Sequence, residues 1–585
     1  MDKYTLSPLA RLLDRLLVVV SLLAVISLVT EYGFDLTPTS LAYIHLTDII
    51  IIWYFILYSV LKLFLSQNRW EYFKSHWFDF VLVVVVFSET AVFVRLTGLD
   101  LLGKFISGVE VVQITKIYIV AFQISIILSL VSHAVKFNQK IATLRFHPAQ
   151  ILMGSFFVII IIGAFLLYLP KAVQPGKTLS FLDALFTSTS ATCVTGLIVV
   201  DTGRQFSLLG QIIILFLIQV GGLGIMTYAS FFALILRRNI SLREKSMMRE
   251  MLNYENMGLI SQLLASTVIF TLTMEALGAV FLYWGLGGQG LHFGERIYSA
   301  IFHSISAFCN AGFSIYSDSF VQFQGNYIVL LTIATLIIMG GLGFPVLLNL
   351  LGMRLSSLGT RGKWLSVQSR MVLGISAVLL IAGTLFYLAA ENGSTLAGLS
   401  WPQKILNSFF QSVTTRTAGF NSTNIGLITT PTVLFFLLLM FIGASPGSTG
   451  GGIKTTTFGI LFAGVWSVIR GRNRIEFFRK NIPYMVLNRS LVIVLFSAAF
   501  IFIAVMILSF AENMPFLDVV FEVFSAFGTV GLSRGITPFL SSIGKTVIIL
   551  TMFFGRLGAL TISLAITTPK EIYHYDYPSE NVMVG

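Results

Sequence analysis

Residues 302–313 read Phe302-His-Ser-Ile-Ser-Ala-Phe-Cys-Asn-Ala-Gly312-Phe313, a short stretch between two long apolar runs. Three other stretches share its leading phenylalanine and its glycine followed by a large apolar residue, and their glycines are Gly196, Gly419 and Gly531. In chain order the four glycines are 116, 107 and 112 residues apart. Each stretch is too short to cross a bilayer, which takes about 20 apolar residues in a helix. The sequence therefore predicts four re-entrant segments, one in each of four unequal repeats.

A second glycine motif recurs in step with the first. Gly-Gly-Leu-Gly at 221–224 and 340–343 and Gly-Arg-Leu-Gly at 555–558 begin 25, 28 and 24 residues after the first glycine of their repeats. In the third repeat the same place, 24 residues after Gly419, opens the run Gly443-Ala-Ser-Pro-Gly-Ser-Thr-Gly-Gly-Gly452. Glycine and proline at this density cannot hold a helix. We therefore expect the span at 431–466 to be broken there.

The composition is that of a membrane protein. Hydrophobic residues make up 56% of the 585 residues and charged residues only 11%, against about 25% charge in soluble domains. Apolar runs recur along the chain and predict twelve spans, at roughly 16–30, 41–65, 78–96, 111–135, 149–169, 207–235, 259–285, 325–351, 371–390, 431–466, 488–511 and 543–567. We predict an all-α polytopic membrane protein with four helix–pore-loop–helix repeats around a pseudo-fourfold central pore, plus an N-terminal four-helix membrane bundle.

These spans divide the chain into six parts. We expect a bundle of about four transmembrane helices over 1–140, pore repeats over 147–240, 257–354, 368–470 and 486–570, and a short cytoplasmic tail over 571–585. The linker at 66–84 resembles part of a voltage-sensor module, although the span at 111–135 carries only Lys116 and no arginine ladder. A degenerate, sensor-like bundle is the interpretation of this first part.

The net charge of +12 comes from basic residues in short loops rather than from a nucleic-acid-binding face. Arginine and lysine cluster at 237–249, 354–370 and 470–480, whereas the alternate loops are poorer in both. The positive-inside rule places these clusters and both termini in the cytoplasm. Two cysteines, Cys193 and Cys309, exclude a disulfide framework, and no histidines have metal-ligand spacing.

The four glycine stretches suit cation conduction. Rings of backbone carbonyls replace the water of an ion without a fixed charge that would trap it, and irregular backbone survives at membrane depth where it lines a water-filled path. Glycines that only assist helix packing are the alternative, but four in register favour a filter. The expected potassium-binding residues are Val194, Thr195, Gly196, Asn310, Ala311, Gly312, Thr417, Ala418, Gly419, Thr529, Val530 and Gly531.

The sequence resembles the Trk/Ktr/HKT superfamily of potassium transporters, and most of all its bacterial TrkH-type pore-forming subunits. The resemblance covers about 147–567 and rests on the four glycine stretches, on Ser445-Pro-Gly-Ser-Thr-Gly-Gly-Gly-Ile-Lys-Thr455 and on Arg556. It implies K+ as the transported ion, with no organic cofactor. Serine at the first filter position goes with sodium permeation in the family, and glycine at all four positions implies potassium preference.

The resemblance also implies partners. They are the lipid bilayer of the cytoplasmic (inner) membrane, a second copy in a homodimer with one pore per subunit, and a cytosolic nucleotide-binding regulatory subunit of the TrkA/KtrA type, with no nucleic acid. The break at 443–452 is then either a hinge or an intramembrane loop that closes the pore. We expect a gate formed by Gly447, Ser448, Thr449, Gly450, Gly451, Gly452, Lys454 and Arg556.

Two arginines and two enzyme-like motifs have more than one interpretation. Arg556 lies mid-span, where a charge is costly and usually functional. It either forms a structural pair with an acidic residue or, as we expect, lies beside the pore near the third-repeat break. Arg416 needs a buried partner, for which Glu522 is the candidate. Gly443–Gly447 matches G-x-S-x-G and Gly447–Lys454 imitates a phosphate loop, but neither lies in the sheet domain that its chemistry requires.

Two rival functions remain. One is a voltage-gated cation channel, which the missing arginine ladder opposes. The other is a polytopic membrane enzyme, which the lack of an intramembrane acid, base or metal cluster opposes. The sequence alone predicts a potassium transporter rather than an enzyme.

Overall fold

The computed structural model describes residues 8–65, 69, 70, 73, 148–224, 260–288, 290, 292–350, 365–472, 474–558 and 561. These residues are almost entirely helical, and their paired strands form one short antiparallel hairpin, β1 (Ile475–Phe477) with β2 (Lys480–Ile482). The predicted all-α class is confirmed. The chain divides into two compact units.

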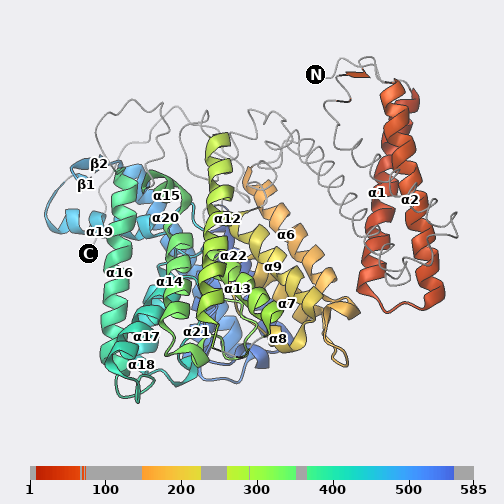
Figure 1. The fold of residues 1–585 in the computed structure, drawn as a ribbon. Helices are drawn as coiled ribbons and strands as arrows, with labels where there is room; N and C mark the ends of the chain where they lie inside the picture. Colours follow the sequence, from red (N-terminus) through yellow and green to blue (C-terminus); the bar gives the residue numbers. More distant parts are fainter. Residues whose placement is uncertain are drawn as a thin grey trace, which may run out of the picture. The chain divides into compact units, whose positions relative to one another are not determined.

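The first unit contains an antiparallel pair of long helices, α1 (Pro8–Gly33) and α2 (Pro38–Leu65) (Figure 1). Ser27 Oγ donates to Asp48 Oδ1 at 2.5 Å between them, the kind of polar contact that joins helices in lipid. The same unit includes η1 (Pro170–Ala172). The predicted spans at 78–96 and 111–135 lie outside the described residues.

The second unit repeats one order of elements four times: a long first helix, a shorter pore helix and a second helix. The first helices are α6 (Pro148–Leu167), α12 (Ile260–Gly285), α16 (Val367–Glu391) and α20 (Tyr484–Ala511). The pore helices are α7 (Phe181–Thr192), α13 (Phe293–Phe308), α17 (Trp401–Thr414) and α21 (Phe516–Gly528). The second helices are α9 (Leu208–Leu223), α14 (Tyr327–Leu342) with α15 (Phe344–Leu350), α18 (Thr430–Phe441) with α19 (Thr455–Ile469), and α22 (Ser542–Leu557).

Short helices lie in the loops that follow the pore helices. They are α8 (Thr202–Gln205), η3 (Val321–Phe323), η4 (Ile425–Leu427) and η5 (Thr537–Phe539). Figure 1 shows α7, α13, α17 and α21 in one half of this unit and the β1–β2 hairpin at the opposite end. The loops after the pore helices therefore lie on one side of the unit and the hairpin lies on the other.

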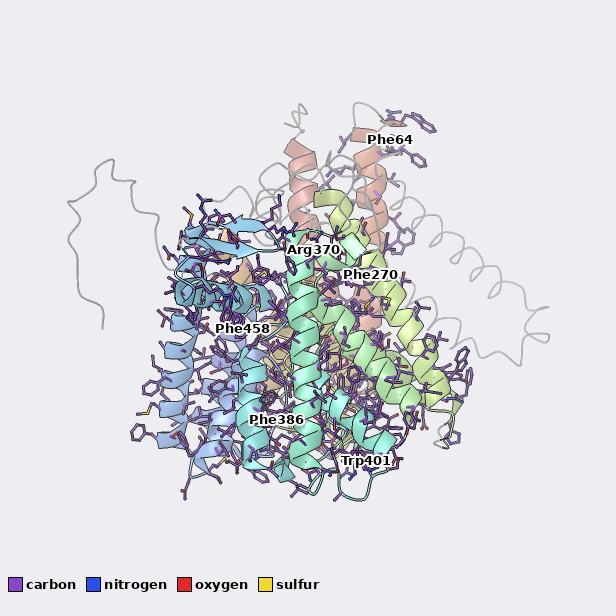
Figure 2. All side chains as sticks on the ribbon, turned by 90° about the vertical axis from the view of Figure 1, so that its left-hand side faces the viewer. Phe64, Phe270, Arg370, Phe386, Trp401 and Phe458 are labelled. Atoms are coloured by element: carbon purple, nitrogen blue, oxygen red, sulfur yellow. The ribbon has the colours of Figure 1, made fainter. Side chains whose placement is uncertain are left out.

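Four described helices are long and apolar enough to span a membrane, over Ala149–Leu167, Ala265–Gly285, Val367–Glu391 and Tyr484–Ala511. On α16 the apolar side chains of Val378, Ile381 and Leu385 are exposed by 60–66%, as expected where lipid is the solvent. Figure 2 shows Arg370 near one end of α16 and Trp401 toward the other. Arginine and tryptophan at opposite ends of an apolar band fit the two interfaces of a bilayer.

Two second helices depart from a straight span. The expected span at 325–351 is bent by 103° between α14 and α15, at Gly343, which has a φ of 88°. Such a φ favours glycine, and the apolar run gave no warning of the bend. The expected break in the third repeat is confirmed, since α18 ends at Phe441 and α19 begins at Thr455.

Candidate functional site

Each pore helix ends in a tight turn that leads to one of the four glycines. Gly196, Gly312, Gly419 and Gly531 have φ values of 92°, 70°, 79° and 91°. The residues two positions earlier, Val194, Asn310, Thr417 and Thr529, also have positive φ, at 58°, 59°, 78° and 49°. Positive φ at alternate residues turns successive carbonyls toward the same side, whereas they alternate in a β-strand. Because positive φ is costly for the four non-glycine residues, the surrounding structure must enforce this conformation.

The four glycines meet in chain order and form what we call the glycine ring. A β-carbon built on each one would lie 3.0–3.1 Å from the Cα of the glycine in the next repeat, and the fourth meets the first. The same β-carbons would meet the carbonyl oxygens of Ala311, Ala418, Val530 and Thr195, respectively. No other residue fits at these four positions without displacing its neighbour. The four loops therefore converge on one point, as the sequence predicted.

The loops turn their N–H groups back onto the pore helices. Thr195 N donates to Ser190 O at 2.8 Å and Val530 N to Ser525 O at 2.8 Å, while the same two serine hydroxyls accept from the ring glycines at 3.1 Å. Ser190, Ser306 and Ser525 occupy one position of the repeat, four residues after its leading phenylalanine. This serine was not predicted, although it is visible when the repeats are aligned on that phenylalanine.

The carbonyl groups of the loops have no such partner. Among the described residues, no protein donor bonds the carbonyl oxygens of 194–196, 310–312, 417–419 and 529–531. Ten of these twelve residues are buried and Gly312 and Gly531 are half-buried. More than nine in ten buried carbonyls in proteins are paired, so this many unpaired ones call for a ligand that is not protein. Oxygen atoms without a fixed charge are suitable ligands for an alkali cation.

The pore helices aim their carboxyl ends at this ring. Their last residues are buried, and helix C-termini carry partial negative charge, which attracts a cation. Gly221, Gly340 and Gly555 of the second glycine motif pack against the carbonyl oxygens of Thr192, Phe308 and Phe527, four residues before each ring glycine. A β-carbon at any of the three would overlap that oxygen. The second motif therefore lets the second helix approach the end of its own pore helix.

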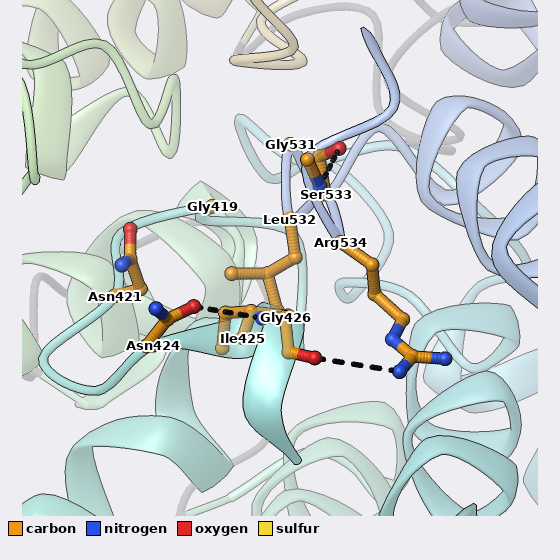
Figure 3. Close-up of a pocket in the computed structure, with 10 residues that line it drawn as sticks. Gly419, Asn421, Asn424, Ile425, Gly426, Gly531, Leu532, Ser533 and Arg534 are labelled. Carbon is orange, nitrogen blue, oxygen red and sulfur yellow. Dashed lines mark hydrogen bonds between the residues drawn. The ribbon is translucent and has the colours of Figure 1, made fainter.

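A cavity of about 160 Å³ lies on the far side of the ring from the pore helices' carboxyl ends, between repeats three and four. Figure 3 shows Asn421, Asn424 and Arg534 around it, with Gly419 and Gly531 of the ring in its wall. Arg534 is held by Asp518 at 2.6 Å and donates to Gly426 O at 3.4 Å. Arg534, paired with Asp518, thus lines the cavity beside the ring.

The break between α18 and α19 lies against the other side of the ring. Gly451 N donates to Thr529 Oγ1 at 3.0 Å, and Gly450 packs against Thr417 Oγ1, so the loop contacts two residues that begin the ring segments. It also reaches the second repeat, where Ser445 N and Thr449 N donate to Gly341 O and Gly340 O at 3.0 and 3.2 Å. The loop therefore packs beside the ring and contacts repeats two and four as well as its own repeat.

Two cations hold this loop. The guanidinium of Arg556 donates to Thr449 O and to Gly221 O, and to Gly222 O at 3.1 Å. Lys454 Nζ donates to Gly450 O at 2.7 Å. The expectation that Arg556 lies near the third-repeat break agrees with these contacts. Its partners are carbonyls rather than the acidic side chain that was the alternative.

The expected pair of Arg416 with Glu522 is wrong. Arg416 donates to Ser376 Oγ at 3.1 Å, on α16 of its own repeat, and Glu522 accepts from Thr537 in the fourth repeat. Alignment of the repeats does not show that Arg416, which follows α17, reaches back to α16, whereas Glu522 on α21 reaches the loop after the ring.

The remaining candidates are structural. Cys193 and Cys309 are free, as predicted, and both are fully buried. Cys309 lies 3.7 Å from Gln219 Oε1, which belongs to an amide whose Nε2 donates to Glu275 at 3.1 Å. Within the described part of the chain, His, Cys, Asp and Glu side chains form no group of three or more that could hold a metal.

Comparison with known proteins identifies the family. The family model for TrkH, described as a cation transport protein, matches residues 117–574. The chain belongs to the TrkH family of cation transport proteins. Members of this family are transporters, not enzymes, so the rival interpretation as a polytopic membrane enzyme is discarded.

Individual relatives of this TrkH-family chain agree. It is 41% identical to the Ktr system potassium uptake protein B of Bacillus subtilis, over 77% of this chain and 99% of that protein. It is 37% identical to the potassium/sodium uptake protein NtpJ of Enterococcus hirae, over 75% and 98%. The crystal structure of the potassium transporter TrkH from Vibrio parahaemolyticus matches with a TM-score of 0.56 and 19% identity, over 75% of this chain and 96% of that one. This last match supports the polytopic fold.

Proposed function

We propose that this chain takes up potassium ions across the cytoplasmic membrane, and that the glycine ring is its selectivity filter. The proposal rests on two observations: the four glycines meet in a ring, and no protein donor among the described residues bonds the twelve carbonyls of the ring segments. In this role residues 194–196, 310–312, 417–419 and 529–531 replace the hydration shell of K+. The Bacillus subtilis relative, which is named a potassium uptake protein, supports the choice of ion.

A second ion is a specific alternative. The relative NtpJ is named a potassium/sodium uptake protein, so uptake of both K+ and Na+ is the competing function. All four ring positions are glycine, which in the family that the sequence resembles implies a preference for K+ over Na+. Competition between the two ions in one uptake assay separates the candidates.

The break loop suits a gate. Residues 447–452 with Lys454 lie across the path below the ring, and their hydrogen bonds run to three different repeats. Arg556 adds a positive charge at the same level, which repels a cation in transit while its hydrogen bonds hold the loop closed. Opening then requires the loop to leave Arg556 and Thr529.

The surroundings follow from charge and resemblance. The hairpin loop with Arg470, Arg472 and Arg479 faces the cytoplasm by the positive-inside rule, so the cavity beside Arg534 faces outward and both termini lie inside. We propose a homodimer in the inner membrane, opened by a cytosolic nucleotide-binding subunit, with the repeat boundaries given above. The relative's assignment to a Ktr system supports an assembly of several components.

Growth of a potassium-uptake-deficient bacterium tests the function. We expect the wild-type chain to restore growth at limiting K+ and to take up K+ in preference to Na+. A chain that reaches the membrane and restores no uptake would refute the proposal. Equal uptake of both ions at equal concentration would instead favour the dual-ion alternative.

A further inference from the structure

In three of the four repeats, one position of the pore helix is hydrogen-bonded to the segment that follows the ring glycine. We call these segments, which are not part of a sheet, the strands beyond the ring. Thr187, His303, Gln411 and Glu522 each come directly after the leading phenylalanine of their pore helix. All four are buried, with 2%, 1%, 0% and 0% of their surfaces exposed. Four chemically different side chains occupy this position, so a sequence pattern gives no sign of a shared role.

His303 holds the second-repeat strand. Its Nδ1 lies 2.8 Å from Ser299 O, which accepts the ring proton and leaves Nε2 as an acceptor. That acceptor lies 3.0 Å from Ser314 Oγ and 3.4 Å from Ile315 N, two and three residues after Gly312. Tyr316 stacks on the imidazole with centroids 4.8 Å apart. The neutral ring thus has a single orientation in which both nitrogens are used.

Gln411 holds the third-repeat strand in the same way. The orientation of its amide that satisfies both ends directs Oε1 at Ser422 N and Thr423 N, at 3.0 and 3.2 Å, and at Thr423 Oγ1 at 3.0 Å. These partners lie three and four residues after Gly419. The hydroxyl of Tyr387 lies 2.8 Å from Thr423 Oγ1 and braces the same group from α16.

Glu522 does so in the fourth repeat. Its carboxylate accepts a hydrogen bond from Thr537, whose Oγ1 lies 2.9 Å from Ser533 Oγ, two residues after Gly531. The first repeat differs. Thr187 Oγ1 donates to Asp183 O of its own helix at 2.8 Å, and the strand is instead packed through buried Leu197 and Val199.

We propose that His303, Gln411 and Glu522 are positioning residues that fix the strands beyond the glycine ring and thereby set its ion selectivity. These segments form no sheet ladder, so single hydrogen bonds hold them. The contacts of His303, Gln411 and Glu522 act beside others, such as the bond from Ser306 Oγ to Phe313 O at 2.8 Å. K+ and Na+ differ in the cage of oxygens that each prefers, and a looser cage adapts to the smaller ion. The inference rests on the proposed uptake function and adds what sets its selectivity.

The test compares leucine variants at the equivalent positions. His303→Leu, Gln411→Leu and Glu522→Leu remove the contacts at similar bulk. Each should lower the ratio of K+ to Na+ uptake severalfold, because the segment beyond the ring loses its buried hydrogen bonds to the pore helix. Glu522→Gln keeps an acceptor for Thr537 and should retain the wild-type ratio. Thr187→Val is the matched control and should also leave the ratio unchanged, since the hydrogen bond of Thr187 runs to Asp183 O of its own helix. Uptake ratios do not depend on the amount of protein in the membrane.

Partner-side substitutions guard against misfolding. Ser314→Ala, Thr423→Val and Thr537→Val remove the other half of each contact with a smaller change, and they should lower the same ratio. Wild-type ratios in all the variants that reach the membrane would overturn the proposal while leaving potassium uptake established. An equal loss in Thr187→Val would also overturn it, because that loss would be general. A wild-type chain that carries no K+ would instead contradict the proposed function itself.

Discussion

Arg556 on α22 donates its guanidinium hydrogen bonds to Thr449 in the third-repeat loop and to Gly221 at the end of α9. Three repeats therefore meet at one side chain. Replacement by glutamine removes the charge and part of the fork, so we expect Arg556→Gln to raise K+ flux severalfold because the loop is released and the barrier falls. Radiotracer uptake at equal surface expression measures it.

The comparison with Arg556→Lys separates charge from hydrogen bonding. Lysine keeps the charge but not the planar fork that reaches two carbonyls at once. If the K+ flux of Arg556→Lys equals that of the wild type, the charge is the main barrier. If it equals that of Arg556→Gln, the hydrogen bonds that hold the loop are the main barrier. Flux equal to wild type in both variants would rule out any role of Arg556 in transport.

Removal of the loop is a more direct test of the gate. Ala444 N donates to Gly451 O at 3.3 Å, and Ile442 pairs with Ile453 at the base of the loop. Deleting 445–450 joins two residues that already lie side by side, so α18 and α19 keep their places. We expect higher K+ flux in proteoliposomes. A folded deletion with unchanged or lower flux would mean that the loop is no barrier.

The glycine ring should not tolerate a side chain. A β-carbon at Gly196 would lie 2.5 Å from Ala311 O, in a backbone conformation with a φ of 92°. We expect Gly196→Ser to reduce K+ uptake at least tenfold and to lower the K+/Na+ ratio. Gly374→Ala on α16 is the control, because that position has open space around it. Normal selectivity in Gly196→Ser would show that the ring does not coordinate the ion.

The charged pair at the cavity beside the ring should tune apparent affinity. Arg534→Gln leaves Asp518 uncompensated at the entrance, which should concentrate cations and lower the KM for K+ about threefold at low ionic strength. The effect should fade at high salt, since charges are screened beyond about 10 Å at 0.1 M. Lys545→Gln is a matched control, because its pair with Asp183 is equally short and equally buried but does not line the cavity. An equal shift in both variants would argue against a local effect.

A buried carboxylate fastens the third repeat. Glu391, at the end of α16, accepts hydrogen bonds from Thr429 N, Thr429 Oγ1 and Thr432 Oγ1 at 2.6–2.8 Å and so holds the start of α18. Glu391→Leu leaves these buried donors without an acceptor and should lower the free energy of unfolding by about 3 kcal/mol. Thermal melting of the purified full chain in detergent measures the change. Glu476→Leu, on an exposed side chain, should leave the melting temperature unchanged, and an equal drop would refute the specific role of Glu391.

The repeats could be predicted from the sequence because their glycines recur in register, each followed by a large apolar residue. Only glycine fits where a β-carbon would meet a carbonyl of the next repeat, as at Gly312 and Gly419. The 103° bend at Gly343 was not predicted, because α14 and α15 form one apolar run in which a glycine is usually a packing residue. The partner of Arg416 was wrong, and the positioning residues were missed, because both depend on side-chain direction and on unlike residues at one position.

A ring built from four stretches of one polypeptide differs from a ring assembled from four identical chains. A codon change in the latter alters every quadrant at once, whereas here it alters one. Substitutions could therefore change the proposed coordination cage one repeat at a time. The four repeats already differ, with His303, Gln411 and Glu522 in three of them and apolar packing in the first. The proposed ion-binding site is therefore not fourfold symmetric, and the preferred position of the ion need not lie on the pore axis.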